Sequence, residues 1–163
     1  MLSCKELIKY LGTYLSNTDF NSFLSNTFTD LSAYDVLKHD YMISDSSGVE
    51  LGFVNEDSVV DDDDQIVFED GNPIFSHFNL YLRSHILVYE LPFGLTFDDK
   101  RGDVFQKAGN PIHTKEGDFL GSPFLIDHHK IDNTIISIDY NIDDMTIKSI
   151  QIRDNNLLKH LKV

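Results

Sequence analysis

The stretch LPFGLTFDDKRGDVFQKAGNP, from Leu91 to Pro111, carries the clearest fold signal in the chain. Asp98 stands where an N-cap belongs, and Asp99 follows in the first turn, where carboxylates meet unpaired backbone N–H groups and the positive end of the helix dipole. Gly109 and then Pro111 end the pattern, because glycine adopts left-handed backbone angles and proline cannot continue a helix. The stretch therefore predicts a short helix between Asp98 and Gly109.

The side chains inside this predicted helix fit a half-buried position. Val104, Phe105 and Ala108 supply one apolar stripe, and Lys107 lies in the last turn, at the negative end of the dipole. A phosphate-binding loop would need a lysine and a hydroxyl side chain directly after a longer glycine-containing run, and this stretch has neither in that place. The pattern predicts a structural element rather than a phosphate or metal site.

Toward the N-terminus, apolar residues recur at helical spacing. Residues 4–15 and residues 19–28 each place apolar side chains on one helical face, and both predict helices. Residues 33–39 predict a shorter turn of helix. The N-terminal region is therefore expected to be helical.

From Tyr41 onward the apolar period changes to that of strands. The sequence GVELGFV, at 48–54, alternates apolar side chains with Glu and Gly, which predicts a half-buried strand. Residues 58–68 predict one or two strands interrupted by the acidic run 61–64, and residues 69–73 predict a turn. A further strand is expected within 77–88.

The C-terminal region predicts an antiparallel hairpin. Residues 123–129 lead into an alternating strand at 136–140, and an acidic turn at 143–144 joins it to a strand that continues to Ile152. The apolar spacing in this last strand contains one odd step, which predicts a β-bulge at Lys148–Ser149.

These elements predict an α+β fold, with N-terminal helices and an antiparallel β meander. The length of 163 residues suits a single domain, 1–163. Both halves run from helix through turn to strands, so residues 1–88 and 89–163 are expected to be two similar helix-plus-sheet modules packed as one unit. No apolar run reaches the about 18 residues of a membrane span, and the first residues lack a signal-peptide core, which favours a cytoplasmic location.

Charge gives the strongest indication of function. The chain has 27 acidic against 13 basic residues, for a net charge of −14. Residues 1–82 hold 15 acidic and 3 basic side chains (−12), whereas residues 83–163 hold 12 and 10 (−2). Such a field repels nucleic acid and anionic membrane, so direct binding to either is not expected. It steers association with a partner of opposite sign, which makes a basic protein the natural complement.

The sequence offers three candidate sites. The run VVDDDDQIV at 59–67 suits a divalent cation, a solvated loop, a charged edge that discourages aggregation, or a protein-docking patch. Four adjacent Asp side chains diverge, which argues against the cation, and no metal ligand or cofactor is expected.

His128 and His129, beside Asp127 and Asp132, could serve a small hydrolase, but neighbouring strand residues face opposite sides. Cys4 has no second cysteine to pair with, and we expect a bystander thiol near a mobile N-terminus.

Three segments together resemble a known family. They are GVELGFV at 48–54, LPFGLTFDDKRGDVFQKAGNP at 91–111 and PFLIDHHKIDNTIISIDYN at 123–141, and they span about half of the chain. The combination is similar to immunity proteins of bacterial polymorphic toxin systems, including contact-dependent growth inhibition. The family commonly has Leu before the glycine stop, where this chain has Ala108. The resemblance implies a noncatalytic inhibitor of a cognate toxin and brings no catalytic residues.

Charge and resemblance lead to one hypothesis. Many delivered toxins are nucleases with basic surfaces, so an inhibitor can compete by placing carboxylates where phosphates would bind. It could block the toxin's active site or bind beside it. The toxin-binding residues predicted on this basis are Asp57, Asp61, Asp62, Asp63, Asp64, Glu69 and Asp70. The alternatives are a hydrolase that uses His128 or His129 with a carboxylate, and a cation-binding module.

Overall fold

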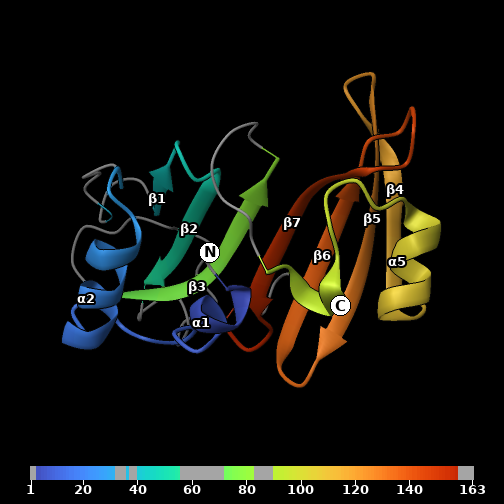
Figure 1. Ribbon diagram of the computed structural model, residues 1–163. Coiled ribbons are helices and arrows are strands. Elements are labelled where there is room, and N and C mark those ends of the chain that lie inside the picture. Colours follow the sequence, from blue (N-terminus) through green and yellow to red (C-terminus); the bar gives the residue numbers. More distant parts are fainter. Residues whose placement is uncertain (1–2, 32–35, 37–39, 56–71, 83–89, 158–163) are drawn as a thin grey trace.

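The structure is a computed structural model, and it describes residues 3–31, 36, 40–55, 72–82 and 90–157. The helices and strands of these residues follow one another along the chain as shown in Figure 1. The helices are α1 (Cys4–Ile8), α2 (Thr18–Thr27), the 3-10 helix η1 (Pro92–Gly94) and α5 (Arg101–Ala108). The strands are β1 (Tyr41–Ser44), β2 (Val49–Asn55), β3 (Pro73–Tyr81), β4 (His113–Phe119), β5 (Ser122–Ile131), β6 (Thr134–Tyr140) and β7 (Ile147–Asp154).

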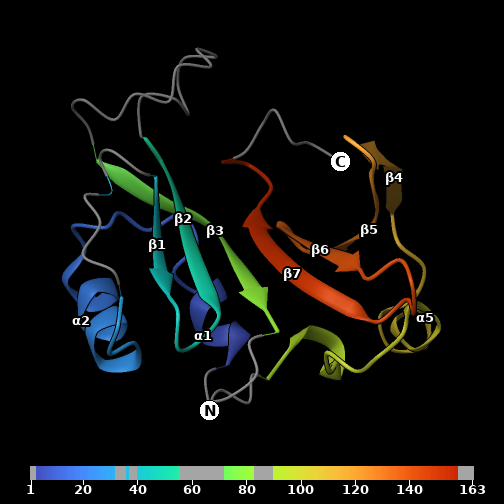
Figure 2. The same cartoon turned by 90° about the horizontal axis from the view of Figure 1, so that it is seen from above.

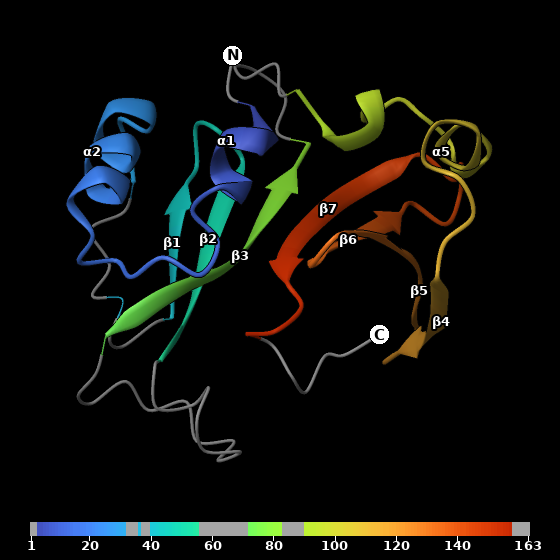
Figure 3. The ribbon, with the colours of Figure 1, turned by 90° about the horizontal axis from the view of Figure 1, so that it is seen from below.

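The strands form one seven-stranded antiparallel sheet in the order β1-β2-β3-β7-β6-β5-β4. The pairing of β3 with β7 joins the strands of the two halves of the chain. Seen from above and from below, α1, α2 and α5 lie on one side of the sheet (Figures 2 and 3). The expected fold class, α+β with N-terminal helices and an antiparallel meander, is confirmed.

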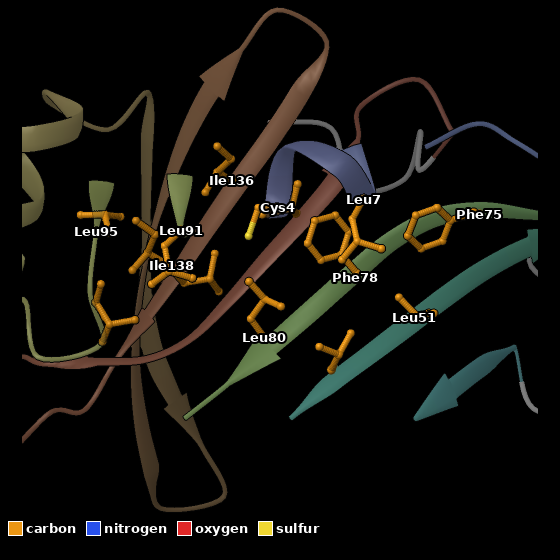
Figure 4. Close-up of a cluster of buried hydrophobic side chains, with 14 of the residues drawn as sticks. Cys4, Leu7, Leu51, Phe75, Phe78, Leu80, Leu91, Leu95, Ile136 and Ile138 are labelled. Atoms are coloured by element: carbon orange, nitrogen blue, oxygen red, sulfur yellow. The ribbon is translucent and has the colours of Figure 1, made fainter. Parts of the chain in front are cut away.

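The core lies between the sheet and these helices. Leu51 of β2 lies opposite Phe78 of β3, which lies opposite Ile152 of β7, which in turn lies opposite Ile136 of β6. All four side chains are fully buried, and Figure 4 shows part of this cluster with Cys4 and Leu7 of α1 packed over it. The row runs from β2 to β6 without a break, so the two halves of the chain share one continuous core. Burial of each such side chain contributes about 1.5–3 kcal/mol.

The N-terminal helices match the prediction in part. The helix expected over 4–15 is wrong in its extent, because α1 ends at Ile8. Gly12, with φ of +83°, donates its N–H to the Phe75 carbonyl, and residues 12–15 bond to the start of β3 instead of continuing the helix. The expected helix 19–28 is confirmed as α2, which begins after Asn17, whose side chain accepts the Phe20 N–H at 3.0 Å. Most of 33–39 falls outside the described residues.

The strands were predicted best where one face is buried. The strand expected at 48–54 is confirmed as β2, and the C-terminal hairpin is confirmed as β6 and β7. The bulge is also confirmed, since Ser149 and Ile147 lie opposite consecutive residues of β6 and leave Lys148 without a partner in the register. The strand expected at 77–88 begins four residues earlier, at Pro73. Residues 58–68 lie outside the described part of the chain.

The helix in the stretch from Leu91 to Pro111 begins at Arg101, so the N-cap predicted at Asp98 is wrong. Asp99 instead closes the preceding turn, accepting the Thr96 N–H at 2.8 Å and pairing with Lys107 Nζ at 2.7 Å. The helix stop is confirmed, because Gly109 has a φ of +79°. In the part of the chain described here, no helix is long and apolar enough to cross a membrane.

Candidate interaction surface

The acidic residues predicted to bind a toxin all fall within 56–71, outside the described residues. They are Asp57, Asp61, Asp62, Asp63, Asp64, Glu69 and Asp70. Their role remains a prediction, and the run 61–64, for which a cation site was the disfavoured alternative, lies outside the described residues as well. Among the residues that are described, no three His, Cys, Asp or Glu side chains gather where they could hold a metal ion.

The two neighbouring histidines of β5 lie on opposite faces of the sheet, as alternation predicts. His128 lies on the face away from the helices, with Nδ1 2.8 Å from Ser137 Oγ on β6 and its ring stacked on His113 of β4. His129 lies on the helix-covered face, where its ring centre is 5.8 Å from that of Phe93. The two imidazoles therefore cannot act on one bound molecule.

The surroundings of His128 disfavour acid–base chemistry. Burial, followed by the charge of Arg153, lowers the pKa of His128 to about 4. A general base works best with a pKa near the working pH, so an imidazole with this pKa is a weak base at neutral pH. The pair formed by His128 and Ser137 is a buried hydrogen bond between β5 and β6, which stabilises the sheet.

Asp127 forms an ion pair that holds α5 against the sheet. Its carboxylate accepts hydrogen bonds from Arg101 Nε at 2.7 Å and Nη2 at 2.9 Å, and from Thr114 Oγ1 at 2.6 Å. Burial raises the pKa of Asp127, but the hydrogen bonds from Arg101 and Thr114 outweigh it and hold the pKa below its usual range. This carboxylate therefore connects α5, β4 and β5 and is not available to activate a histidine.

β4 is the last strand of the described sheet on the side opposite to β1. Every residue of β4 except Thr114 is exposed. Leu120 and Gly121, with φ of 53° and 82°, form a type I′ turn to β5. Phe119 and Leu120 at this tip are 70% and 90% exposed.

The sequence does not predict this strand. Its sequence, HTKEGDF, is polar on both faces, so it lacks the apolar alternation that marks a half-buried strand. The signal that could have found it is the tight turn at Leu120–Gly121, since two-residue hairpin turns commonly carry glycine. An unpaired strand edge can pair with another chain, and exposed apolar side chains beside it can add contacts to such a pairing.

The described residues thus define an α+β protein with a single antiparallel sheet and an exposed edge. Comparison of the chain with protein-family models, curated protein sequences and solved structures finds no significant match.

Proposed function

We propose that this protein is an immunity protein, which binds a cognate bacterial toxin domain in the cytoplasm of the producing cell and blocks it without chemistry of its own. The toxin domain is proposed to be basic, as expected of a nuclease. The resemblance of the segments 48–54, 91–111 and 123–141 to such proteins supports this proposal. They form β2, the η1–α5 region, and the β5–β6 hairpin.

The observation that carries the proposal is the charge asymmetry. Residues 1–82 have a net charge of −12, whereas the remaining residues have −2. A negative charge of this size concentrated in one half speeds the encounter with a cationic protein and repels nucleic acid. An inhibitor with this charge therefore binds the basic toxin domain itself and not the nucleic acid on which the toxin acts.

The geometry around the histidines favours binding over hydrolysis. A hydrolase would need a histidine with a pKa near neutrality beside an available carboxylate. Here burial holds the pKa of His128 at about 4, and Asp127 is held by Arg101 and Thr114. His128 and Asp127 are therefore both held by partners within the described structure, Ser137 for the imidazole and Arg101 and Thr114 for the carboxylate.

Co-expression tests the proposal. The C-terminal domain encoded directly upstream should stop growth when it is expressed alone, and this protein should restore growth and co-purify with that domain. The double variant His128→Gln/His129→Gln should still protect if it folds, which circular dichroism verifies. Loss of protection by a folded double variant would favour the hydrolase, and a harmless upstream domain would contradict the proposal.

A further inference from the structure

We propose that the outer edge of β4, together with the hairpin tip formed by Phe119 and Leu120, is the docking surface for an extended segment of the toxin domain. The segment pairs with β4 as an additional strand of the described sheet, with basic side chains beside Glu116 and Asp118 and an apolar side chain against the tip. The identity of the partner rests on the proposed function, whereas the surface itself is argued from the structure.

The backbone of β4 offers the hydrogen bonds that strand addition requires. Phe119 and Ser122 flank the two-residue turn, and in such hairpins this pair exchanges both backbone hydrogen bonds. Because the pattern alternates along an antiparallel pair, the amide groups of Thr114, Glu116 and Asp118 then point away from β5. A partner strand can bind to these groups without disturbing the sheet.

The turn carries a residue that its geometry disfavours. Type I′ turns prefer Asn or Asp before glycine, because both central residues have positive φ. Here Leu120 occupies that place with φ of 53°, at a cost of about 1–2 kcal/mol, and 90% of the residue's surface remains exposed. In the free protein the leucine side chain gains almost no burial in return. A contact with a bound partner would bury this leucine side chain.

A second copy of the chain is a poor occupant of this edge. Two copies of β4 that pair antiparallel in one continuous sheet are related by a two-fold axis that passes through one residue position. An axis at Lys115, at Glu116 or at Asp118 places that residue opposite itself, and an axis at Gly117 places Glu116 opposite Asp118 twice. Each of these four registers sets like charges directly across from one another, which is destabilising. The edge therefore disfavours self-pairing and suits a different chain.

The two faces of β4 define the chemistry of that chain. Glu116 and Asp118 lie on the helix-covered face, exposed at the edge. On the other face, Lys115 Nζ lies 5.8 Å from the centre of the Phe124 ring, and Phe119 lies on the same face of the strand. A matching strand would carry Lys or Arg on the face beside Glu116 and Asp118, and apolar or aromatic residues on the face beside Phe119. A basic toxin domain would supply such Lys or Arg residues.

Isothermal titration calorimetry with the upstream toxin domain tests the surface. Glu116→Pro removes an outward N–H, and proline is tolerated on edge strands where that group faces solvent. Its matched control, Glu116→Gln, removes the charge and keeps the N–H. We expect Kd to rise at least 10-fold for Glu116→Pro, and only a few-fold for Glu116→Gln.

Leu120→Asn tests the tip without loss of folding, because asparagine suits positive φ. We expect Kd to rise at least 10-fold while the melting temperature of the free protein stays equal or increases. Wild-type affinity in both Leu120→Asn and Glu116→Pro would overturn the docking surface and leave the proposed function standing. No binding by the wild-type protein would overturn both. A wild-type dimer that Glu116→Pro dissociates, seen by analytical ultracentrifugation, would assign the edge to a second copy instead.

Discussion

Replacement of Asp127 by asparagine should destabilise the protein more than the loss of an ordinary ion pair. The carboxylate is fully buried and accepts two hydrogen bonds from Arg101 and one from Thr114. Asparagine keeps the shape, but it removes the charge and turns one acceptor into a donor that faces the guanidinium.

The structure sets the size of this effect. Loss of one partner of a buried ion pair costs about 3–5 kcal/mol, because the other charge is left without compensation. The Arg101 side chain is 31% exposed, so water can solvate part of its charge. We therefore expect Asp127→Asn to lower the free energy of unfolding by about 2–3 kcal/mol.

Urea denaturation at pH 7 measures this loss. Glu90→Gln is the matched control, since Glu90 pairs with Lys5 at 3.4 Å on the exposed surface and its replacement should produce no measurable change. Arg101→Met added to Asp127→Asn should recover part of the lost stability, because no charge then remains unpaired. If Asp127→Asn cost no more than the control, the ion pair would not hold α5 to the sheet as described.

Three further predictions concern the core and its titration. A Cβ on Gly52 would lie 2.0 Å from His77 Cε1, so Gly52→Ala should lower the free energy of unfolding by about 1–3 kcal/mol in urea denaturation. Adding His77→Ala to this variant should remove most of that cost, and failure to do so would contradict this contact. Burial lowers the pKa of His77 and of His128 to about 4, so below pH 6.5 the unfolded chain binds more protons than the folded protein. The free energy of unfolding should therefore fall as the pH drops from 6.5 to 4, by up to about 3 kcal/mol per histidine. Replacement of His128 by asparagine should make this fall shallower. Burial raises the pKa of Cys4 to about 12, so its thiol should react with iodoacetamide only on unfolding, and fast reaction in the native state would place it outside the core.

The elements that the sequence predicted share one property, which is a buried face that shows as an apolar period. β2, β6, β7 and α2 all have it, and the odd apolar spacing in β7 also located the bulge at Lys148. β4 lies at the edge and buries neither face, so its sequence has no period to find.

The errors in element boundaries have a different cause, namely tertiary contacts. Apolar spacing continues past Ile8, but Gly12 and Leu15 donate backbone hydrogen bonds to β3, which ends α1 early. Asp99 resembles a helix-start residue, yet Lys107, eight residues later, pairs with it and the helix begins after it. Cys4 was expected near a mobile terminus, whereas it lies in the core. No local pattern specifies such partners.

Of the predicted site features, the alternation of His128 and His129 falls within the described residues and is confirmed, whereas the acidic residues predicted from charge lie outside them. The asymmetry between the halves is visible in the composition, and the opposite orientation of His128 and His129 follows from strand geometry. The exposed tip at Leu120 required the structure, because an apolar residue next to glycine reads equally well as part of a buried turn.

The salt dependence of association with the proposed toxin partner tests the central claim most directly. Stopped-flow measurement from 50 mM to 500 mM NaCl should show an association rate that falls by at least 10-fold, because the acidic half steers a basic partner. The dissociation rate should change much less, since short-range contacts set it. An association rate that does not depend on salt would contradict the proposal that the acidic half of this chain steers it to a cationic protein.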